Sequence, residues 1–328
     1  MSTKIALIGL GQVGASAGLA LGTYKDQIIR IGHDGSNKRM KELEKAGVFD
    51  SGETKLAQAV QDADLVIIDL PVDMVRDGMQ LMADNLKSET VIICFSSVVQ
   101  EIYKWAREIL PANQAFIVVH PVIDPDRLAD WNDTLLMPHA DLFENCDMVI
   151  AADAETQPRA LKMATDLCGL LKAKPYFSEP LEADGILART NLLPILNATA
   201  FLNTLLNSTG WGDARRITSR GFFRTASISM LYDESEYFGI SGLLNRENSV
   251  RVLDEMVAEL QLLREMLQEG DEEGLRESMN KARRGYEGWL YQRTSGDWDQ
   301  EIQPESPESR NIAERLFGGK TGKKKDNR

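Results

Sequence analysis

A glycine-rich motif near the amino terminus constrains the fold of this chain more than any other feature of its sequence. Residues 4–10 (KIALIGL) form an apolar run, which is typical of a buried parallel strand. The pattern G-x-G-x-x-G overlaps the end of this run and opens a segment of helical character. Its glycines permit a tight turn, a close approach of the backbone to a pyrophosphate and close packing of helix on strand. The residues predicted to bind a dinucleotide in this way are Gly9, Gly11, Gln12, Val13 and Gly14.

An acidic residue follows the second apolar run at the interval that such a site requires. Asp34 comes shortly after residues 27–32 (QIIRIG). A carboxylate there accepts hydrogen bonds from the adenosine ribose and repels a 2′-phosphate, so we expect the cofactor to be NAD. Residues 36–39 (SNKR) could hold that phosphate if Asp34 turned aside, and NADP therefore remains an alternative.

Short β-branched runs alternate with longer charged segments through the first half of the chain. The charged segments, such as 37–46 and 73–87, have the length and spacing of helices. Parallel neighbours need crossover connections, so this alternation predicts an α/β fold with a Rossmann-type, doubly wound parallel sheet over residues 1–178. The expected strands are 4–10, 27–32, 65–70, 90–95, 115–119 and 148–151.

The pattern changes after about residue 180, beyond which we expect no strand. Residues 182–208 are rich in Leu, Ala and Asn, with Pro194 starting or kinking a helix. Apolar residues at helical spacing predict a helix over 248–268 that stops at Gly270, and a further helix from 272 to about 291. These segments predict an all-helical carboxyl-terminal domain.

Length and charge limit the classes of function. We expect the helical domain to span 179–295 and to join two copies as a homodimer, with a disordered polar tail over 296–328. The net charge of −13 opposes binding to nucleic acid or to an anionic membrane. Because the first apolar run is too short to span a bilayer, we expect a soluble, cytoplasmic protein. The cysteines are too few and too widely spaced for a zinc cluster, so we expect no metal site. The cysteines, expected to be reduced and buried, are Cys94, Cys146 and Cys168.

Polar residues follow two of the expected strands at one edge of the sheet. His120 follows the run 115–119, and Ser96 and Ser97 follow the run 90–95. In an open parallel sheet, ligands bind outside the carboxyl ends of the strands. A histidine near a substrate hydroxyl, oriented by a serine, is suited to act as a general base. The other interpretation is a histidine that caps or packs a strand end.

Several segments together carry a family resemblance: IALIGLGQVGASAGLAL, ADLVIIDLPVD (63–73), SSVVQEI (96–102) and His120-Pro121. In these segments the chain resembles the prephenate and arogenate dehydrogenases of tyrosine biosynthesis, over about residues 4–290. The resemblance implies NAD(P)-dependent oxidative decarboxylation, with Ser97 and His120 at the ring hydroxyl of the substrate and His120 accepting its hydrogen bond. It also implies that Leu70 and Pro71 lie at the cofactor and Ser96 at the substrate.

The helical half carries a basic cluster in an acidic chain. The segment Gly221-Phe222-Phe223-Arg224 is similar to the family segment that supplies an arginine for the substrate carboxylate, although Arg224 is displaced from the family position. A carboxylate substrate would suit guanidinium groups, and we expect Arg224 and Arg220 to bind it. A solvated or salt-bridged face is the other interpretation. The cluster comprises Arg215, Arg216, Arg220 and Arg224.

Two other functions stay open. The first is a Rossmann dehydrogenase for another small hydroxy acid or an imine; related hydroxy-acid enzymes use a helical lysine, whereas no lysine lies between Lys174 and Lys281. The second is a non-catalytic dinucleotide sensor. Two histidines of the resembling family fall at Ala183 and Leu192, which favours the sensor, while His120 and Ser97 favour an enzyme.

Overall fold

The computed structural model describes residues 2–127, 137–230 and 235–298. The chain forms two compact units, Met1–Leu262 and Leu263–Arg328. The expected domain boundary at residue 178 stays a prediction, and the expected disordered tail lies almost wholly outside the described residues. No helix among the described residues has the length and apolar character needed to cross a membrane.

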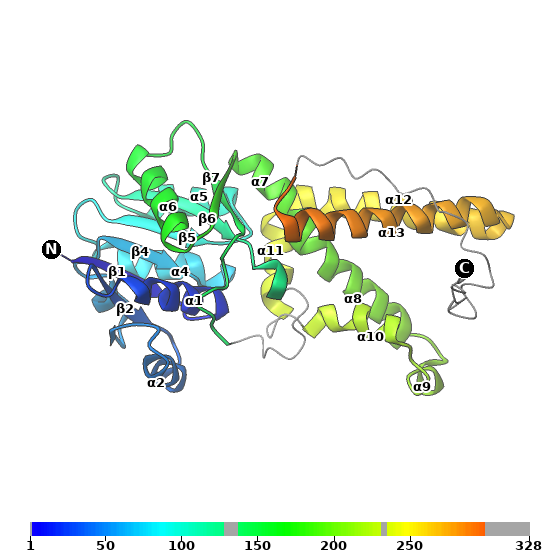
Figure 1. The fold of residues 1–328 in the computed structure, drawn as a ribbon, viewed down its shortest axis with the longest axis horizontal. Coiled ribbons are helices and arrows are strands. Elements are labelled where there is room, and N and C mark those ends of the chain that lie inside the picture. Colours follow the sequence, from blue (N-terminus) through cyan, green and yellow to red (C-terminus); the bar gives the residue numbers. More distant parts are fainter. Residues whose placement is uncertain (1, 128–136, 231–234, 299–328) are drawn as a thin grey trace, which may run out of the picture. The chain divides into compact units, whose positions relative to one another are not determined.

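The first unit is built on an eight-stranded sheet with the strand order β3-β2-β1-β4-β5-β6-β7-β8 (Figure 1). From β3 to β6 all neighbours run parallel; for example, Ile5 of β1 lies opposite Arg30 of β2 and Leu65 of β4. The expected Rossmann-type sheet is confirmed. Its strands are β1 Thr3–Ile8, β2 Ile28–His33, β3 Ser51–Gly52, β4 Leu65–Ile68, β5 Val91–Phe95, β6 Ala115–Pro121, β7 Asp147–Ala151 and β8 Lys174–Ser178.

The far edge of the sheet corrects the expectation of a wholly parallel arrangement. β7 runs antiparallel to β6, with His120 opposite Val149. β8 then runs parallel to β7, because helix α6 (Pro158–Leu170) forms the crossover between them. Strand β8 was not expected from the sequence; four of its five residues are exposed, so it lacks the apolar signature of a buried strand.

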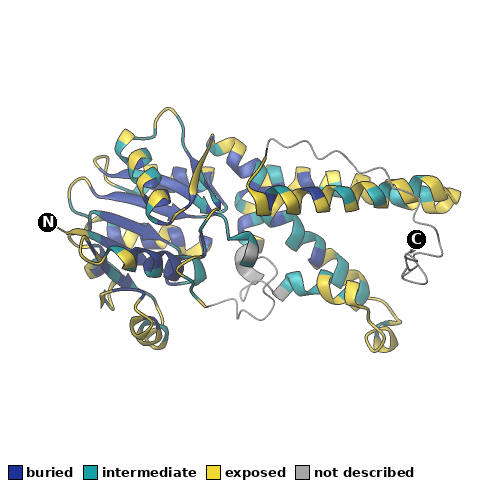
Figure 2. Cartoon of the chain, in the orientation of Figure 1, coloured by how far each residue is buried: buried dark blue, intermediate teal, exposed yellow. Residues whose placement is uncertain are grey.

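Helices cover both faces of the sheet, and the strands between them are mostly buried (Figure 2). On one face, α1 and α6 pack against β1, β4 and β5, together with α2 at one end. On the other face, α3, α4 and α5 pack against the same strands, and α7 joins them. The bounds of these helices are α1 Gln12–Leu21, α2 Asn37–Lys45, α3 Leu56–Val60, α4 Val72–Ala83, α5 Gln100–Ile109 and α7 Pro180–Leu187.

Beyond Ser178 the described residues form helices and turns with no strand, as expected. A π-helical turn, Ala188–Leu192, joins α7 to α8, and Pro194 is the second residue of α8. Gly270 has φ +69° and follows the end of α12, so the expected stop is confirmed. The remaining helices are α8 Leu193–Leu206, α9 Trp211–Ala214, α10 Arg220–Ala226, α11 Ser235–Leu244, α12 Arg246–Glu269 and, in the second unit, α13 Glu272–Ser295.

Candidate functional site

The carboxyl ends of four parallel strands bring the expected site residues to one edge of the sheet. Gly9 follows β1, Asp69 follows β4 and Ser96 follows β5, while His120 is the penultimate residue of β6. Strand β6 is therefore longer than expected from the sequence and includes the histidine. Because neighbouring strands β1, β4, β5 and β6 are parallel, these residues share an edge, which is where ligands bind in open sheets of this kind.

Steric crowding fixes glycine at the fingerprint positions. Gly9 has φ +82°, and a Cβ added there would lie 2.3 Å from the Asp69 carbonyl oxygen. A Cβ on Gly14 would lie 2.6 Å from the Gly9 carbonyl oxygen. Gly11, at the N-cap of α1, has no side chain to cap the helix. The backbone N–H groups of Gln12 and Val13, in the first turn, are of the kind that a helix start leaves for a phosphate.

Asp69 is a residue of this loop that the sequence analysis missed. Its carboxylate Oδ2 accepts a hydrogen bond of 2.6 Å from the Gly14 backbone N–H, next to the start of α1. Burial raises the pKa of Asp69 to about 6, and the Gly14 hydrogen bond and the charge of Arg39 oppose the shift only in part. The signal in the sequence was an acidic residue at the end of an apolar strand (LVIID), beside the glycine-rich loop.

Asp34 lies where the second apolar strand reaches the same loop. Its carboxylate accepts hydrogen bonds from the Leu10 N–H at 3.1 Å and the Ser36 N–H at 2.8 Å. The Arg39 side chain donates to the Leu10 carbonyl at 2.5 Å, so a cation lies next to this carboxylate. Leu70 and Pro71 follow β4; a Cβ on Gly9 would touch the Leu70 side chain, which places Leu70 beside the loop, and Pro71 is the N-cap of α4.

His120 is held as a neutral imidazole at this edge. Burial lowers its pKa to about 4, and a hydrogen bond with the Ser96 backbone opposes the shift only in part. At pH 7 the ring is therefore neutral: one ring nitrogen carries a hydrogen, and the other is available as an acceptor.

A second residue beside His120 comes from the helical segment. The side-chain amide of Asn191 lies 3.4 Å from Nε2 of His120, a long hydrogen bond. Asn191 is in the π-helical turn Ala188–Leu192, and such turns are frequent at functional sites. An amide that donates to Nε2 favours the tautomer with an acceptor lone pair on that nitrogen.

The loop after β5 is fixed by a buried carboxylate. Asp184 of α7, 2% exposed, accepts from the Val99 N–H at 2.8 Å and from the Gln100 N–H at 3.1 Å. It thereby caps α5 and ties the serine loop to the helical segment. Ser96 Oγ accepts from the Val98 N–H at 3.0 Å. Among the described residues no hydrogen bond joins Ser97 to His120, so the orienting role of Ser97 stays a prediction.

The basic cluster lies elsewhere. Arg220 and Arg224 are exposed on α10, which Figure 1 shows alongside α8 and away from the sheet. Phe222 of α10 packs against Phe201 and Trp211, with ring centroids 5.9 and 5.8 Å apart. These aromatic contacts pack α10 against α8 and α9. Among the described residues no hydrogen bond or ion pair joins either arginine to His120.

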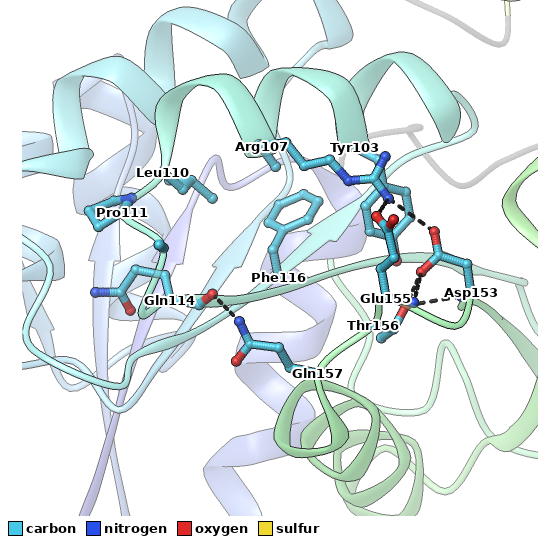
Figure 3. A pocket seen from close by; sticks show the side chains of 12 residues that line it. Tyr103, Arg107, Leu110, Pro111, Gln114, Phe116, Asp153, Glu155, Thr156 and Gln157 are labelled. Atoms are coloured by element: carbon cyan, nitrogen blue, oxygen red, sulfur yellow. Dashed lines mark hydrogen bonds and ion pairs between the residues drawn. The ribbon is translucent and has the colours of Figure 1, made fainter.

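A cavity of about 310 Å³ lies at a different place on the first unit (Figure 3). It is lined by α5, the start of β6 and the turn after β7, and it contains none of the expected site residues. Its cation, Arg107, is already paired with Asp153 at 3.0 Å and Glu155 at 2.9 Å. The chemistry expected from the sequence therefore belongs to the carboxyl edge and not to this cavity.

Comparison with known proteins gives the relationship of the chain. A family model described as the nucleotide-binding domain of prephenate dehydrogenase matches residues 17–177. The cyclohexadienyl dehydrogenase of Zymomonas mobilis subsp. mobilis is 26% identical over 273 residues, covering 81% of this chain and 90% of that protein. The prephenate dehydrogenase of Bacillus subtilis is 24% identical over 277 residues, covering 84% and 73%.

Solved structures share the fold. The prephenate dehydrogenase from A. aeolicus, in complex with hydroxyphenyl propionate and NAD+, superposes with a TM-score of 0.74 at 19% identity, covering 86% of this chain and 96% of that one. The Synechocystis arogenate dehydrogenase superposes with a TM-score of 0.67 at 19% identity, covering 88% and 100%.

The sheet and its glycine-rich loop define a Rossmann-type nucleotide-binding protein with a helical carboxyl-terminal half. The family model and the two sequence relatives make the assignment more specific: the chain belongs to the prephenate dehydrogenase family. The resemblance found in the sequence is confirmed. The model match begins at residue 17, so the loop at residues 9–14 is evidence independent of it.

The contacts of Asp184 generate a prediction about the serine loop. Asp184→Ala removes the acceptor for the buried Val99 N–H and for the partly buried Gln100 N–H, and we expect the free energy of unfolding to fall by about 2–3 kcal/mol, measured by urea denaturation. Lys104→Ala, at an exposed position of the same helix α5, should change it by less than about 0.5 kcal/mol. Equal effects of the two substitutions would show that Asp184 does not anchor the loop.

Proposed function

We propose that this protein is a NAD-dependent dehydrogenase that oxidatively decarboxylates prephenate or arogenate. Its membership of the prephenate dehydrogenase family supports this proposal. The observation that carries it is a neutral histidine, His120, at the sheet edge that also presents the glycine-rich loop. We further propose that this chemistry takes place in the cytoplasm, which cell fractionation would test.

The residues at the loop fit a dinucleotide. Gly9 and Gly14 leave no room for side chains, and α1 begins with N–H groups suited to a pyrophosphate. Asp34 is positioned to accept from ribose hydroxyls and to disfavour a 2′-phosphate, which supports NAD over NADP. Bound NAD would supply the hydride acceptor, nicotinamide C4.

His120 supplies the base. The reaction removes a hydride from the ring carbon that bears the hydroxyl and a proton from that hydroxyl, and loss of carbon dioxide leaves an aromatic ring. A neutral imidazole accepts the hydroxyl proton, which favours departure of the hydride. The Asn191 amide beside Nε2 holds the ring in an accepting tautomer until the substrate hydroxyl takes over the contact. Ser97 is proposed to contact the same hydroxyl.

Direct assay tests the proposal. Purified protein is mixed with prephenate or arogenate and with NAD or NADP, and the absorbance of reduced nicotinamide is followed. Turnover with one pair is the expected result and identifies substrate and cofactor together. Calorimetric binding of NAD without turnover on either substrate would overturn the proposed reaction and favour another substrate or a sensor.

Removal of the base should affect turnover and not cofactor binding. His120→Asn keeps a polar side chain but no basic nitrogen, and we expect kcat to fall by about 10²–10⁴-fold. The Kd for NAD should change by less than about threefold because the imidazole does not hold the cofactor. Since the pKa of His120 is lowered to about 4, the loss of wild-type kcat/KM on acidification that His120 causes should centre near that pH. A variant with unchanged turnover would refute the assigned role.

Cofactor choice should depend on Asp34. Asp34→Ala removes the ribose acceptor and the charge that repels a 2′-phosphate, while Arg39 stays in place. We expect the ratio of kcat/KM for NAD to that for NADP to fall by about tenfold or more. Exchange of the exposed Asp26 for Ala is the control and should leave the ratio unchanged. A ratio that is insensitive to Asp34 would show that another residue reads the ribose.

We also propose a homodimer formed through the helical segment. Large apolar side chains are exposed along α12, with Val257 48% and Leu260 52% exposed, and such patches mark association surfaces. Light scattering should give twice the mass of one chain, and the double variant Val257→Glu, Leu260→Glu should lower the measured mass toward that of one chain. A wild-type monomer at micromolar concentration would refute the dimer.

Arg220 and Arg224 remain our proposal for the substrate carboxylate, a role that requires a second copy or a movement of α10.

A further inference from the structure

An acidic side chain of the protein itself lies at the start of α1, beside the glycine-rich loop. The carboxylate of Asp69 accepts a hydrogen bond of 2.6 Å from the Gly14 N–H. This N–H is one of the donors that a helix start leaves without an intrahelical acceptor. A Cβ on Gly11 would lie 3.1 Å from the same carboxylate oxygen. The fingerprint assigns Gly11 to the close approach of the pyrophosphate. Two anions therefore meet at the start of α1 once a dinucleotide binds.

The surroundings of Asp69 do not neutralise it. Arg39 of α2 is the cation that acts on it, and that side chain is also bound to the Leu10 carbonyl. Cys94 of β5 is a buried thiol whose own pKa is raised. From β2 the nearby titratable groups are Asp34, which is bonded to backbone N–H groups, and His33, whose Nδ1 lies 2.9 Å from the Glu53 carbonyl oxygen. From α1 the facing residues of the first turn carry no charge.

We propose that Asp69 makes dinucleotide binding proton-linked: the carboxylate takes up one proton from solvent when a pyrophosphate binds at the start of α1. The inference rests on the proposed cofactor site. A like charge nearby disfavours the ionised form of a carboxyl group. A protonated Asp69 still accepts from Gly14 N–H through its carbonyl oxygen, and its new O–H can donate to a phosphate oxygen. One O–H bond forms, and no oxidant or other reactant is needed.

The direction of the pH dependence follows from the free protein. The pKa of Asp69 in the free protein is about 6, so below that pH the carboxyl group is already protonated and binding of the dinucleotide takes up few protons. Above it, the proton must come from solvent, and affinity falls as the pH rises. The fall is at most tenfold per pH unit and ends at the pKa that Asp69 has in the complex. Between pH 6 and pH 8 we expect the Kd to rise by about tenfold.

Calorimetry with ADP-ribose measures this directly. ADP-ribose carries the pyrophosphate without the nicotinamide, and its phosphates keep a constant charge over this pH range. Titrations of the wild-type protein in two buffers of different ionisation enthalpy give the number of protons taken up. At pH 7.5 we expect about half a proton or more per ADP-ribose bound.

Two variants assign the proton. Asp69→Asn keeps a carbonyl oxygen for Gly14 N–H but has no charge, so proton uptake should fall to near zero. Its Kd at pH 8 should be at least about fivefold lower than that of the wild type and should change little with pH. Asp77→Asn removes one charge from the exposed side of α4 and should behave as the wild type. Proton uptake by a group other than Asp69 would survive in both variants.

Each outcome decides between the two proposals. Binding of ADP-ribose by the wild type without proton uptake, or uptake that persists in Asp69→Asn, would overturn the role of Asp69 and leave the cofactor site standing. Failure of the wild type to bind either ADP-ribose or NAD would refute the dinucleotide site itself. The wild-type measurement decides the inference even if Asp69→Asn does not fold.

Discussion

The close contact of helix α1 with the ends of β1 and β4 is the constraint on which the rest of the site depends. The contact is made by backbone atoms: the Gly9 and Asp69 carbonyl oxygens occupy the space that side chains at Gly14 and Gly9 would need. Further along the helix, a Cβ on Gly18 would lie 2.6 Å from the Val48 carbonyl oxygen. Because the helix is held this tightly, its N-terminus is fixed relative to the strand ends that carry Ser96 and His120.

Much of the sheet could be predicted because its information is local. Buried parallel strands are covered on both faces, so they are read as apolar runs, and the glycine fingerprint gives the start of α1. The direction of β7 could not be predicted, since pairing depends on which neighbour a strand meets and not on its own residues. Strand β8 was missed because its exposed residues show no alternation.

Some residues of the candidate site could likewise be predicted from the sequence, and others could not. Gly9, Asp34 and His120 stand at the ends of recognisable runs, and their placement at one edge follows from parallel topology. Asp69 and Asn191 could not be assigned a role from spacing, because each acts through a contact with a residue 55 or 71 positions away. The orientation of α10 likewise depends on aromatic packing against α8, which sequence spacing does not encode.

The π-helical turn between α7 and α8 has a consequence for how this family can vary. A π turn is equivalent to one residue inserted into an α-helix, so the chain beyond it is rotated by about 100° relative to an uninterrupted helix. Asn191 lies within this insertion, whereas Asp184 lies in the regular helix before it. Loss of one residue here would leave the Asp184 anchor in place while turning a different side chain toward His120. A relative could thus exchange the residue beside His120 through a change in length, with every neighbouring amino acid retained.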